Sequence, residues 1–180
     1  MRIVVDDLKK RLSLTLERDS AEFPALKEVA DSGIVRFVSP VTCEVMVEKL
    51  AAMIDVSGDI AVQVELPCSR CLVGCVVPLQ IHFFQSYVEE LPAVESDDGA
   101  EVELSAEEMG LELFDGEAID LLEEIQQQII LALPRYPLCD EGCKGLCPHC
   151  GVDLNKEHCS CEQKKVSFSF GALKDFKVEK

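Results

Sequence analysis

Apolar and polar residues alternate in several short runs over the first half of the chain. A period of two places every second side chain on the same face, which is the pattern of a strand with one buried face. These runs predict strands at residues 12–17, 34–47, 60–66 and 76–87. Ser57-Gly58-Asp59 has the composition of a turn and is expected to precede the third run. Short strands joined by turns predict an antiparallel β meander or a small open barrel.

Two segments have a helical pattern instead. Residues 23–30 fit a short helix with Pro24 near its start, where proline is favoured. Residues 118–133 read as an amphipathic helix with acids in its first turns, and Pro134 ends it. We expect this helix to cover the open face of the sheet and to lead the chain to Cys139. The apolar positions on its face are Leu121, Leu122, Ile125, Ile129 and Leu133.

Composition places the chain among globular proteins. It has 180 residues, 48% of them hydrophobic, and a mean hydropathy of +0.13. No apolar run approaches the length of a membrane span, and acids interrupt the N-terminus where a signal peptide would be apolar. We therefore expect a cytoplasmic protein in a reducing compartment. There, ten cysteines indicate metal or thiol chemistry rather than disulfides.

Charge is the second strong compositional feature, with a formal net charge of −17. Residues 89–124 contain fifteen acids and no Lys or Arg. A solvated acidic loop is the simpler interpretation, and a docking surface for a basic partner is the more specific one. A chain this acidic does not bind a phosphate backbone by bulk electrostatics, so any nucleic-acid contact would need a small local patch.

The most informative motif is Cys147-Pro-His-Cys150-Gly, in a stretch with six cysteines among residues 139–161. Two cysteines two residues apart, with Pro in the turn and Gly just after, form a tight knuckle whose backbone N–H groups face the sulfurs. The neighbouring residues are polar, so buried apolar cysteines are a poor explanation. Structural zinc is the expected cofactor.

The spacing of the cysteines predicts two zinc sites. A tetrahedral site needs two pairs that converge, and an eight-residue excursion separates Cys147 and Cys150 from Cys159 and Cys161. We expect these four to bind one zinc. Four further cysteines would bind the second and clip the cysteine-rich segment onto the sheet. They are Cys139, Cys143, Cys68 and Cys71.

Some neighbouring residues leave alternatives open. Cys68-Ser-Arg-Cys71 lies between two predicted strands, whereas a thioredoxin-like redox pair would begin a helix, so metal is favoured. Cys75 is a spare or alternative ligand. His149 and His158 are possible substitute ligands. Cys43 falls within a strand pattern and is predicted to be a core residue.

These patterns together predict an α+β protein with two parts. Residues 1–133 would form the antiparallel sheet and its packing helix, with an acidic insertion at 89–110. Residues 134–180 would form a cysteine-rich zinc module and a tail. Within these parts, residues 111–116 fit a short strand leading into a turn, and residues 166–176 fit an apolar strand or short helix.

Three blocks of sequence resemble the YceD family. They are Cys68-Ser-Arg-Cys71-Leu, the helix that ends Leu131-Ala-Leu-Pro134, and the segment from Cys139 through Cys147-Pro-His-Cys150-Gly-Val-Asp-Leu-Asn155. The resemblance covers the chain from about Ile34 onward. It implies a role in ribosomal RNA production or large-subunit assembly and implies no catalytic residue. The segment Ser167–Gly171 departs from the start of the last helix in similar proteins.

Three hypotheses follow. The first is a non-enzymatic factor with structural zinc, whose acidic surface holds a basic partner such as a ribosome assembly or rRNA-processing protein, with no membrane and no small-molecule substrate. The second is direct binding of ribosomal RNA through the lysines of the zinc module. The third is a thiol enzyme or a metal- or redox-responsive regulator. The lysines of the second hypothesis are Lys144, Lys156, Lys164 and Lys165.

Overall fold

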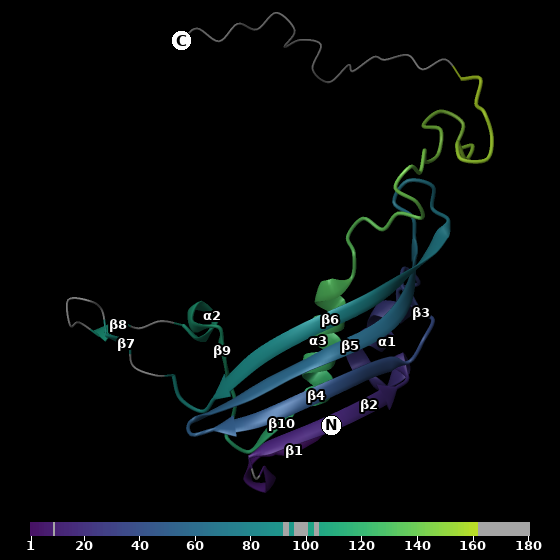
Figure 1. Cartoon of the computed structure of the whole chain (residues 1–180). Helices are drawn as coiled ribbons and strands as arrows, with labels where there is room; N and C mark the ends of the chain where they lie inside the picture. Colours follow the sequence, from purple (N-terminus) through teal and green to yellow (C-terminus); the bar gives the residue numbers. More distant parts are fainter. Residues whose placement is uncertain (9, 92–93, 96–100, 103–104, 162–180) are drawn as a thin grey trace, which may run out of the picture.

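The computed structural model describes residues 1–8, 10–91, 94–95, 101–102 and 105–161. Strands make up most of its regular structure, and the helices are few (Figure 1). The strands are β1 (Arg2–Val4), β2 (Arg11–Arg18), β3 (Arg36–Phe37), β4 (Val41–Leu50), β5 (Met53–Pro67), β6 (Gly74–Val88), β7 (Val94–Glu95), β8 (Glu101–Val102), β9 (Leu111–Leu113) and β10 (Ala118–Asp120). The helices are α1 (Pro24–Asp31), α2 (Ala106–Met109) and α3 (Leu121–Ala132), with short 3₁₀ turns at Val5–Asp7 and Ser20–Glu22.

The main sheet is an open antiparallel meander. Its strand order is β2-β4-β5-β6-β9, and β3 pairs with β5 beside this path. All pairs are antiparallel except β6 with β9, which is parallel. The meander of the two predicted arrangements is therefore the observed one, and the short strand predicted near residue 111 is β9.

The turn predicted at Ser57–Asp59 is wrong, because these residues lie in the middle of the fifteen-residue strand β5. The chain reverses instead at Ala51 and Ala52, between β4 and β5, where Ala51 has a φ of 31°.

Gly58 lies where the neighbouring strands approach β5 too closely for a larger residue. A Cβ atom there would lie 2.7 Å from the Glu44 carbonyl oxygen and 2.7 Å from a ring carbon of Phe83. Glycine leaves room for both neighbours.

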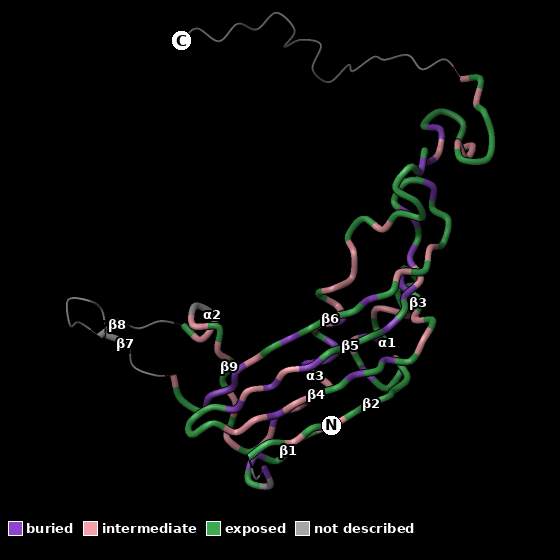
Figure 2. Tube along the Cα trace, in the orientation of Figure 1, coloured by how far each residue is buried: buried purple, intermediate pink, exposed green. Residues whose placement is uncertain are grey.

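One face of the sheet forms the core. The inward side chains of β4 and β5 are buried, and α1 and α3 lie against that face (Figures 1 and 2). Two contacts fix the helices: the Ala25 backbone N–H donates to Gln126 Oε1 at 3.0 Å, and the Tyr87 hydroxyl donates to Glu124 Oε2 at 2.7 Å. Burial and then the bond to Glu124 raise the pKa of Tyr87, so it stays a donor. The helix therefore covers the sheet as expected.

Helix α3 begins three residues later than the pattern predicted. Residues 118–120 form β10, which pairs with β1. The Asp120 side chain then caps the helix by accepting the Leu122 backbone N–H at 3.1 Å. The helix ends at Ala132, because Leu133 already has an extended backbone. None of the helices in the described residues is long and apolar enough to span a membrane.

The hairpin of β5 and β6 projects past the rest of the sheet, and the chain after α3 returns to lie against its tip (Figure 1). The Ser69 backbone N–H at the tip donates to the Pro137 carbonyl oxygen at 2.8 Å. This return brings the cysteines of the hairpin and those after residue 138 to one end of the molecule. The strand or helix predicted at 166–176 lies outside the described residues.

Candidate metal centres

The first centre starts from the loop between β5 and β6. Pro67 is the last residue of β5, and the following backbone closes a tight loop in which the Cys68 N–H donates to the Val73 carbonyl and the Leu72 N–H donates to the Cys68 carbonyl, each at 2.9 Å. Leu72 takes a left-handed conformation with a φ of 63°. The loop aims both Cys68 and Cys71 inward, where they are buried.

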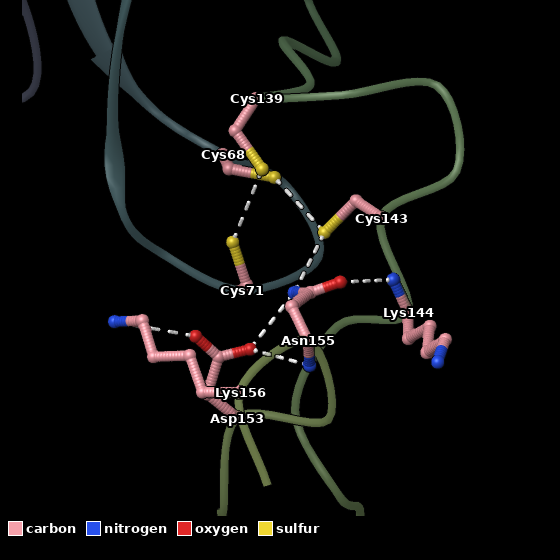
Figure 3. Close-up of polar contacts among 8 residues, drawn as sticks. All are labelled: Cys68, Cys71, Cys139, Cys143, Lys144, Asp153, Asn155 and Lys156. Carbon is pink, nitrogen blue, oxygen red and sulfur yellow. Dashed lines mark hydrogen bonds and ion pairs between the residues drawn. The ribbon is translucent and has the colours of Figure 1, made fainter.

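Cys139 and Cys143 complete this centre from the returning chain (Figure 3). The four sulfur atoms lie within 4.8 Å of one another. Cys68 Sγ is 3.9 Å from Cys143 Sγ, and Cys71 Sγ is 3.5 Å from Cys139 Sγ. A zinc ion with sulfurs at about 2.3 Å needs them about 3.8 Å apart, so the cluster fits a tetrahedral ion. We call this group the hairpin centre.

Arg70, between the two loop cysteines, holds the returning chain in place. Its guanidinium donates to the carbonyl oxygens of Glu141 at 3.1 Å and Cys143 at 2.8 Å. Its own carbonyl accepts the Leu146 backbone N–H at 3.0 Å. Gly145 passes so close that a Cβ there would lie 2.9 Å from the Arg70 carbonyl oxygen. The sequence analysis missed Arg70, and its position inside the CxxC motif was the available signal.

The second centre groups Cys147, Cys150, Cys159 and Cys161, whose sulfurs also lie within 4.8 Å of one another. Cys159 Sγ is 3.2 Å from Cys147 Sγ and 3.7 Å from Cys150 Sγ. The knuckle forms as its sequence predicts, with the Gly151 N–H donating to the Cys147 carbonyl at 2.9 Å and a φ of 75° at Gly151. We call this group the terminal centre.

Backbone donors prepare one thiolate in each centre. The backbone N–H groups of Cys139 and Arg70 lower the pKa of Cys68 to about 6, and those of Cys150 and His149 lower the pKa of Cys147 to about 6. A hydrogen bond between two sulfurs lowers the pKa of one partner, as at Cys68 and Cys147, and raises the pKa of the other. Cys71 raises the pKa of Cys139 to about 12. A cation among the sulfurs would let all four ionise, since thiolates are the form that binds zinc.

Asn155 connects the two centres (Figure 3). Its Nδ2 donates to Cys143 Sγ at 3.3 Å, and its Oδ1 accepts the Lys144 backbone N–H at 2.7 Å. Asp153 Oδ1 holds the amide through Nδ2 at 2.8 Å and the Asn155 backbone N–H at 3.0 Å. Asn155 therefore belongs to the loop of the terminal centre but contacts a sulfur of the hairpin centre. The sequence analysis did not single it out.

The structure brings the eight predicted ligands together in the predicted two groups of four, while zinc binding itself stays a prediction. His149 and His158 belong to neither group of sulfurs. Cys75 packs against the hairpin centre, and its Sγ donates to the Leu66 carbonyl at 3.2 Å. Cys43 lies in the core, as expected, and burial raises its pKa to about 12.

The lysines predicted to contact RNA are only partly placed. Lys156 Nζ lies 3.6 Å from Asp153 Oδ2, and Lys144 is exposed. Lys164 and Lys165 lie outside the described residues. The structure thus assembles the cysteines and leaves the predicted basic patch as a prediction.

The fold and these centres define a class: an α+β protein, mostly strands, with an open sheet and two groups of four cysteines that could bind metal. Comparison with known proteins gives the family. The family model for large ribosomal RNA subunit accumulation protein YceD matches residues 56–177, and the chain belongs to this family. The family's name implies a role in accumulation of the large ribosomal RNA subunit.

The individual relatives match part of this chain at low sequence identity. A protein of Arabidopsis thaliana named large ribosomal RNA subunit accumulation protein YCED homolog 1, chloroplastic, is 34% identical over 55 residues, which are 31% of this chain and 17% of that protein. An uncharacterized protein of Mycobacterium tuberculosis is 31% identical over 114 residues, 63% of this chain and 51% of that protein. One from Mycobacterium leprae is 26% identical over 121 residues, 67% and 52% of the two chains.

The chain thus spans about half the length of its mycobacterial relatives and a smaller share of the plant protein. No solved structure matches it.

Proposed function

We propose that this chain is a non-enzymatic factor for large-subunit ribosomal RNA accumulation that holds a basic assembly or rRNA-processing protein on the exposed face of its sheet. Two structural zinc ions would fix the hairpin tip and the chain that returns to it. The factor would act in the cytoplasm, where its thiols stay reduced and available to metal.

The observation that carries the proposal is a set of like charges placed directly across strands. Glu44 on β4 is opposite Asp59 on β5, and Glu48 is opposite Asp55. Facing acids destabilise a sheet, so the exposed pair of Glu44 and Asp59, with the half-buried pair of Glu48 and Asp55 beside it, favours a role in binding cations or basic side chains. A shallow hollow of about 430 Å³ opens between Glu44, Asp59 and His82 and is large enough for a lysine or arginine side chain.

Several acids of residues 89–124 have structural roles instead. Glu124 is buried and accepts from Tyr87. Glu123 accepts from the side chains of Gln126 at 2.5 Å and Gln127 at 3.0 Å. On the sheet face Asp55 also accepts from Ser86 Oγ at 2.6 Å, and Asp59 Oδ1 lies 3.0 Å from His82 Nδ1. Glu44 and Asp59 nevertheless remain exposed, which makes the sheet face the better candidate for docking than this part of the acidic segment.

The chemistry of the centres supports a non-enzymatic role. Four cysteines around one zinc leave no position for a substrate or water, as is usual in structural sites. The hairpin centre joins residues far apart in sequence, so metal there would stabilise the fold rather than act on a substrate.

The test is complementation of cells that lack this protein, read as the ratio of large- to small-subunit ribosomal RNA. We expect Glu44→Gln/Asp59→Asn to lower that ratio relative to wild type, although removal of the facing charges should stabilise the isolated protein. Glu28→Gln/Asp31→Asn removes the same charge from the exposed side of α1 and should complement fully. Full complementation by both variants would overturn the docking proposal.

Direct RNA binding is the weaker candidate, because Lys156 is already paired with Asp153. If it is correct, Lys144→Ala/Lys156→Ala should lower RNA affinity and reduce the dependence of binding on salt. A thiol-regulator role would instead need cysteines that react quickly while zinc stays bound.

A further inference from the structure

The outer edge of the main sheet is strand β2. Within the described residues β2 pairs on one side only, with β4. Its side chains alternate between exposed and half-buried, the half-buried ones being Leu12, Leu14 and Leu16. An eight-residue edge with half-buried leucines is unusual, because proteins normally protect such edges from pairing with another chain.

The hydrogen-bonding groups on this edge belong to alternate residues. The Lys49 backbone N–H donates to the Lys10 carbonyl at 2.9 Å, so Lys10 points its backbone groups toward β4. Because these directions alternate along a strand, Leu12, Leu14 and Leu16 also point theirs toward β4. The backbone groups directed away from the sheet are those of Arg11, Ser13, Thr15 and Glu17.

The sequence of β2 is complementary to itself in one antiparallel register. When Leu14 is placed opposite Leu14 of a second copy, Leu12 faces Leu16, Ser13 faces Thr15 and Arg11 faces Glu17. Leucines then meet only leucines on the inner face, and opposite charges meet on the outer face. A register centred on Thr15 instead would place Leu12 opposite Arg18.

We propose that two copies of this chain pair through β2 in the register centred on Leu14, forming one continuous sheet. A twofold axis perpendicular to the sheet keeps both helix-covered faces on one side and both acidic faces on the other. The outward backbone groups of Arg11, Ser13, Thr15 and Glu17 bond to those of the second copy.

A groove beside β2 adds apolar surface to this interface. It measures about 400 Å³ and is lined by residues of the N-terminal segment and β2. Val4, one of its lining residues, is 48% exposed. The leucines of the second copy would lie at the open side of this groove, where covering the apolar surface favours association. The remaining lining residues are Met1, Arg2, Ile3, Leu8, Arg11, Leu12 and Leu14.

The net charge of −17 opposes association of two copies at low salt. The edge itself does not share this charge, since β2 carries Arg11 and Arg18 against Glu17. At about 0.15 M salt, repulsion beyond roughly 8 Å is screened, whereas the contacts across the edge persist. The dimer should therefore be measured at or above that salt concentration.

The experiment is sedimentation equilibrium of the zinc-loaded full chain and three variants. Wild type should dimerise reversibly. Glu17→Arg should weaken the dimer about tenfold, because two symmetric Arg–Glu pairs become Arg–Arg pairs. Glu17 faces Thr42 within its own chain, so this change leaves no repulsion inside the monomer.

The second variant, Arg11→Glu/Glu17→Arg, exchanges the charges and should regain the dimer relative to Glu17→Arg alone. Arg11 also faces Glu48 in its own chain, so thermal unfolding must confirm that the exchange variant is folded. The third variant, Glu28→Arg, makes the same charge change on α1 and should dimerise like wild type. A monomeric wild type, or an exchange variant no better than Glu17→Arg, would overturn the proposed register.

Amide hydrogen exchange gives a second readout that needs no substitution. The Ser13 and Thr15 amides should become protected as protein concentration rises, whereas the Leu14 and Leu16 amides, bonded to β4, should be protected at every concentration. Exchange at Ser13 and Thr15 that does not change with concentration would count against edge pairing, even if another surface produced a dimer.

Discussion

The side-chain amide of Asn155 donates a hydrogen bond to the sulfur of Cys143 at 3.3 Å. The two residues belong to different cysteine groups: Cys143 to the hairpin centre and Asn155 to the loop of the terminal centre. A donor that faces a metal-bound thiolate stabilises its negative charge and fixes its direction. We therefore expect this contact to couple the order of one centre to the metal affinity of the other.

We predict that Asn155→Ala weakens zinc binding at the hairpin centre by about 10–100-fold, the usual effect of removing a hydrogen-bond partner of a metal ligand. Competition with a coloured chelator measures this, since the more weakly held zinc should be released first. The control is Glu157→Ala, which changes an exposed neighbour whose side chain contacts neither a sulfur nor Asp153 among the described residues. Equal zinc affinities in wild type and Asn155→Ala would show that the contact does not support the metal.

The assignment of ligands predicts how many zinc ions each variant retains. Wild type should carry two, and Cys68→Ser/Cys71→Ser should carry one, because that change removes half the sulfurs of the hairpin centre. Native mass spectrometry counts the ions directly.

Cys75→Ser is the matched control for the zinc count, because Cys75 packs beside the hairpin centre without belonging to it. It should keep both ions. One zinc in wild type and in Cys68→Ser/Cys71→Ser alike would confine metal to the terminal centre and free the hairpin pair for redox chemistry.

The grouping of the cysteines could be predicted from sequence for a geometric reason. Pairs separated by one to three residues place their sulfurs close together, and the only remaining question is which pairs can converge. The spacing of the cysteines does not show which other residues hold them in position. Arg70 and Asn155 act through backbone carbonyls and a sulfur that come close only after the chain returns from α3. The CxxC motif singles out Arg70 as a candidate but not its distant partners, and no local pattern singles out Asn155.

The prediction of a turn at Ser57–Asp59 was wrong because a glycine that is needed for packing between strands looks like a turn residue in the sequence. Gly58 lies between Ser57 and Asp59, and local composition indicates a turn there. Its glycine is required by two close neighbours on the flanking strands, the Glu44 carbonyl on β4 and the Phe83 ring on β6. A single sequence does not reveal that these neighbours approach so closely, so the turn-like pattern was misleading.

We predict that Gly58→Ala destabilises the protein by about 1–3 kcal/mol, as overpacking of a filled site usually does. The added Cβ would meet the Glu44 backbone, which cannot rotate away, as well as the flexible ring of Phe83. Urea unfolding of the zinc-loaded protein measures the loss. Ser57→Ala, at the adjacent half-buried position, should change stability by less than about 0.5 kcal/mol. A Gly58→Ala protein as stable as wild type would mean that the strands separate there at little cost.

The start of α3 shows a further limit of periodicity. Residues 118–120 continue the apolar pattern of the helix, but pairing with β1 uses their backbone groups in a strand. Pairing with β1, which is far away in the sequence, therefore sets the residue at which α3 begins. Asp120 then becomes the capping residue, with its carboxylate 3.0 Å from the Met1 ammonium and 3.1 Å from the Leu122 backbone nitrogen.

The last prediction concerns the pH dependence of this cap. Burial alone would raise the pKa of Asp120, but the hydrogen bonds from the Met1 ammonium and the Leu122 N–H outweigh it and lower the pKa below the usual 3.8. A carboxylate whose pKa is lowered by folding stabilises the protein above its unfolded pKa. That stabilisation is lost as the pH falls through the lower, folded value.

Asp120→Ala should therefore cost about 1 kcal/mol near neutral pH, the usual effect of removing such a cap. Asp120→Asn should cost less, because asparagine also caps helices but lacks the charge.

The measurement is urea unfolding of wild type and Asp120→Asn from neutral pH to below 3.8. Release of metal in acid affects both proteins alike, so the difference between them is the informative quantity. That difference should disappear at the lowest pH. If it persists there unchanged, the charge of Asp120 is not what stabilises the start of α3.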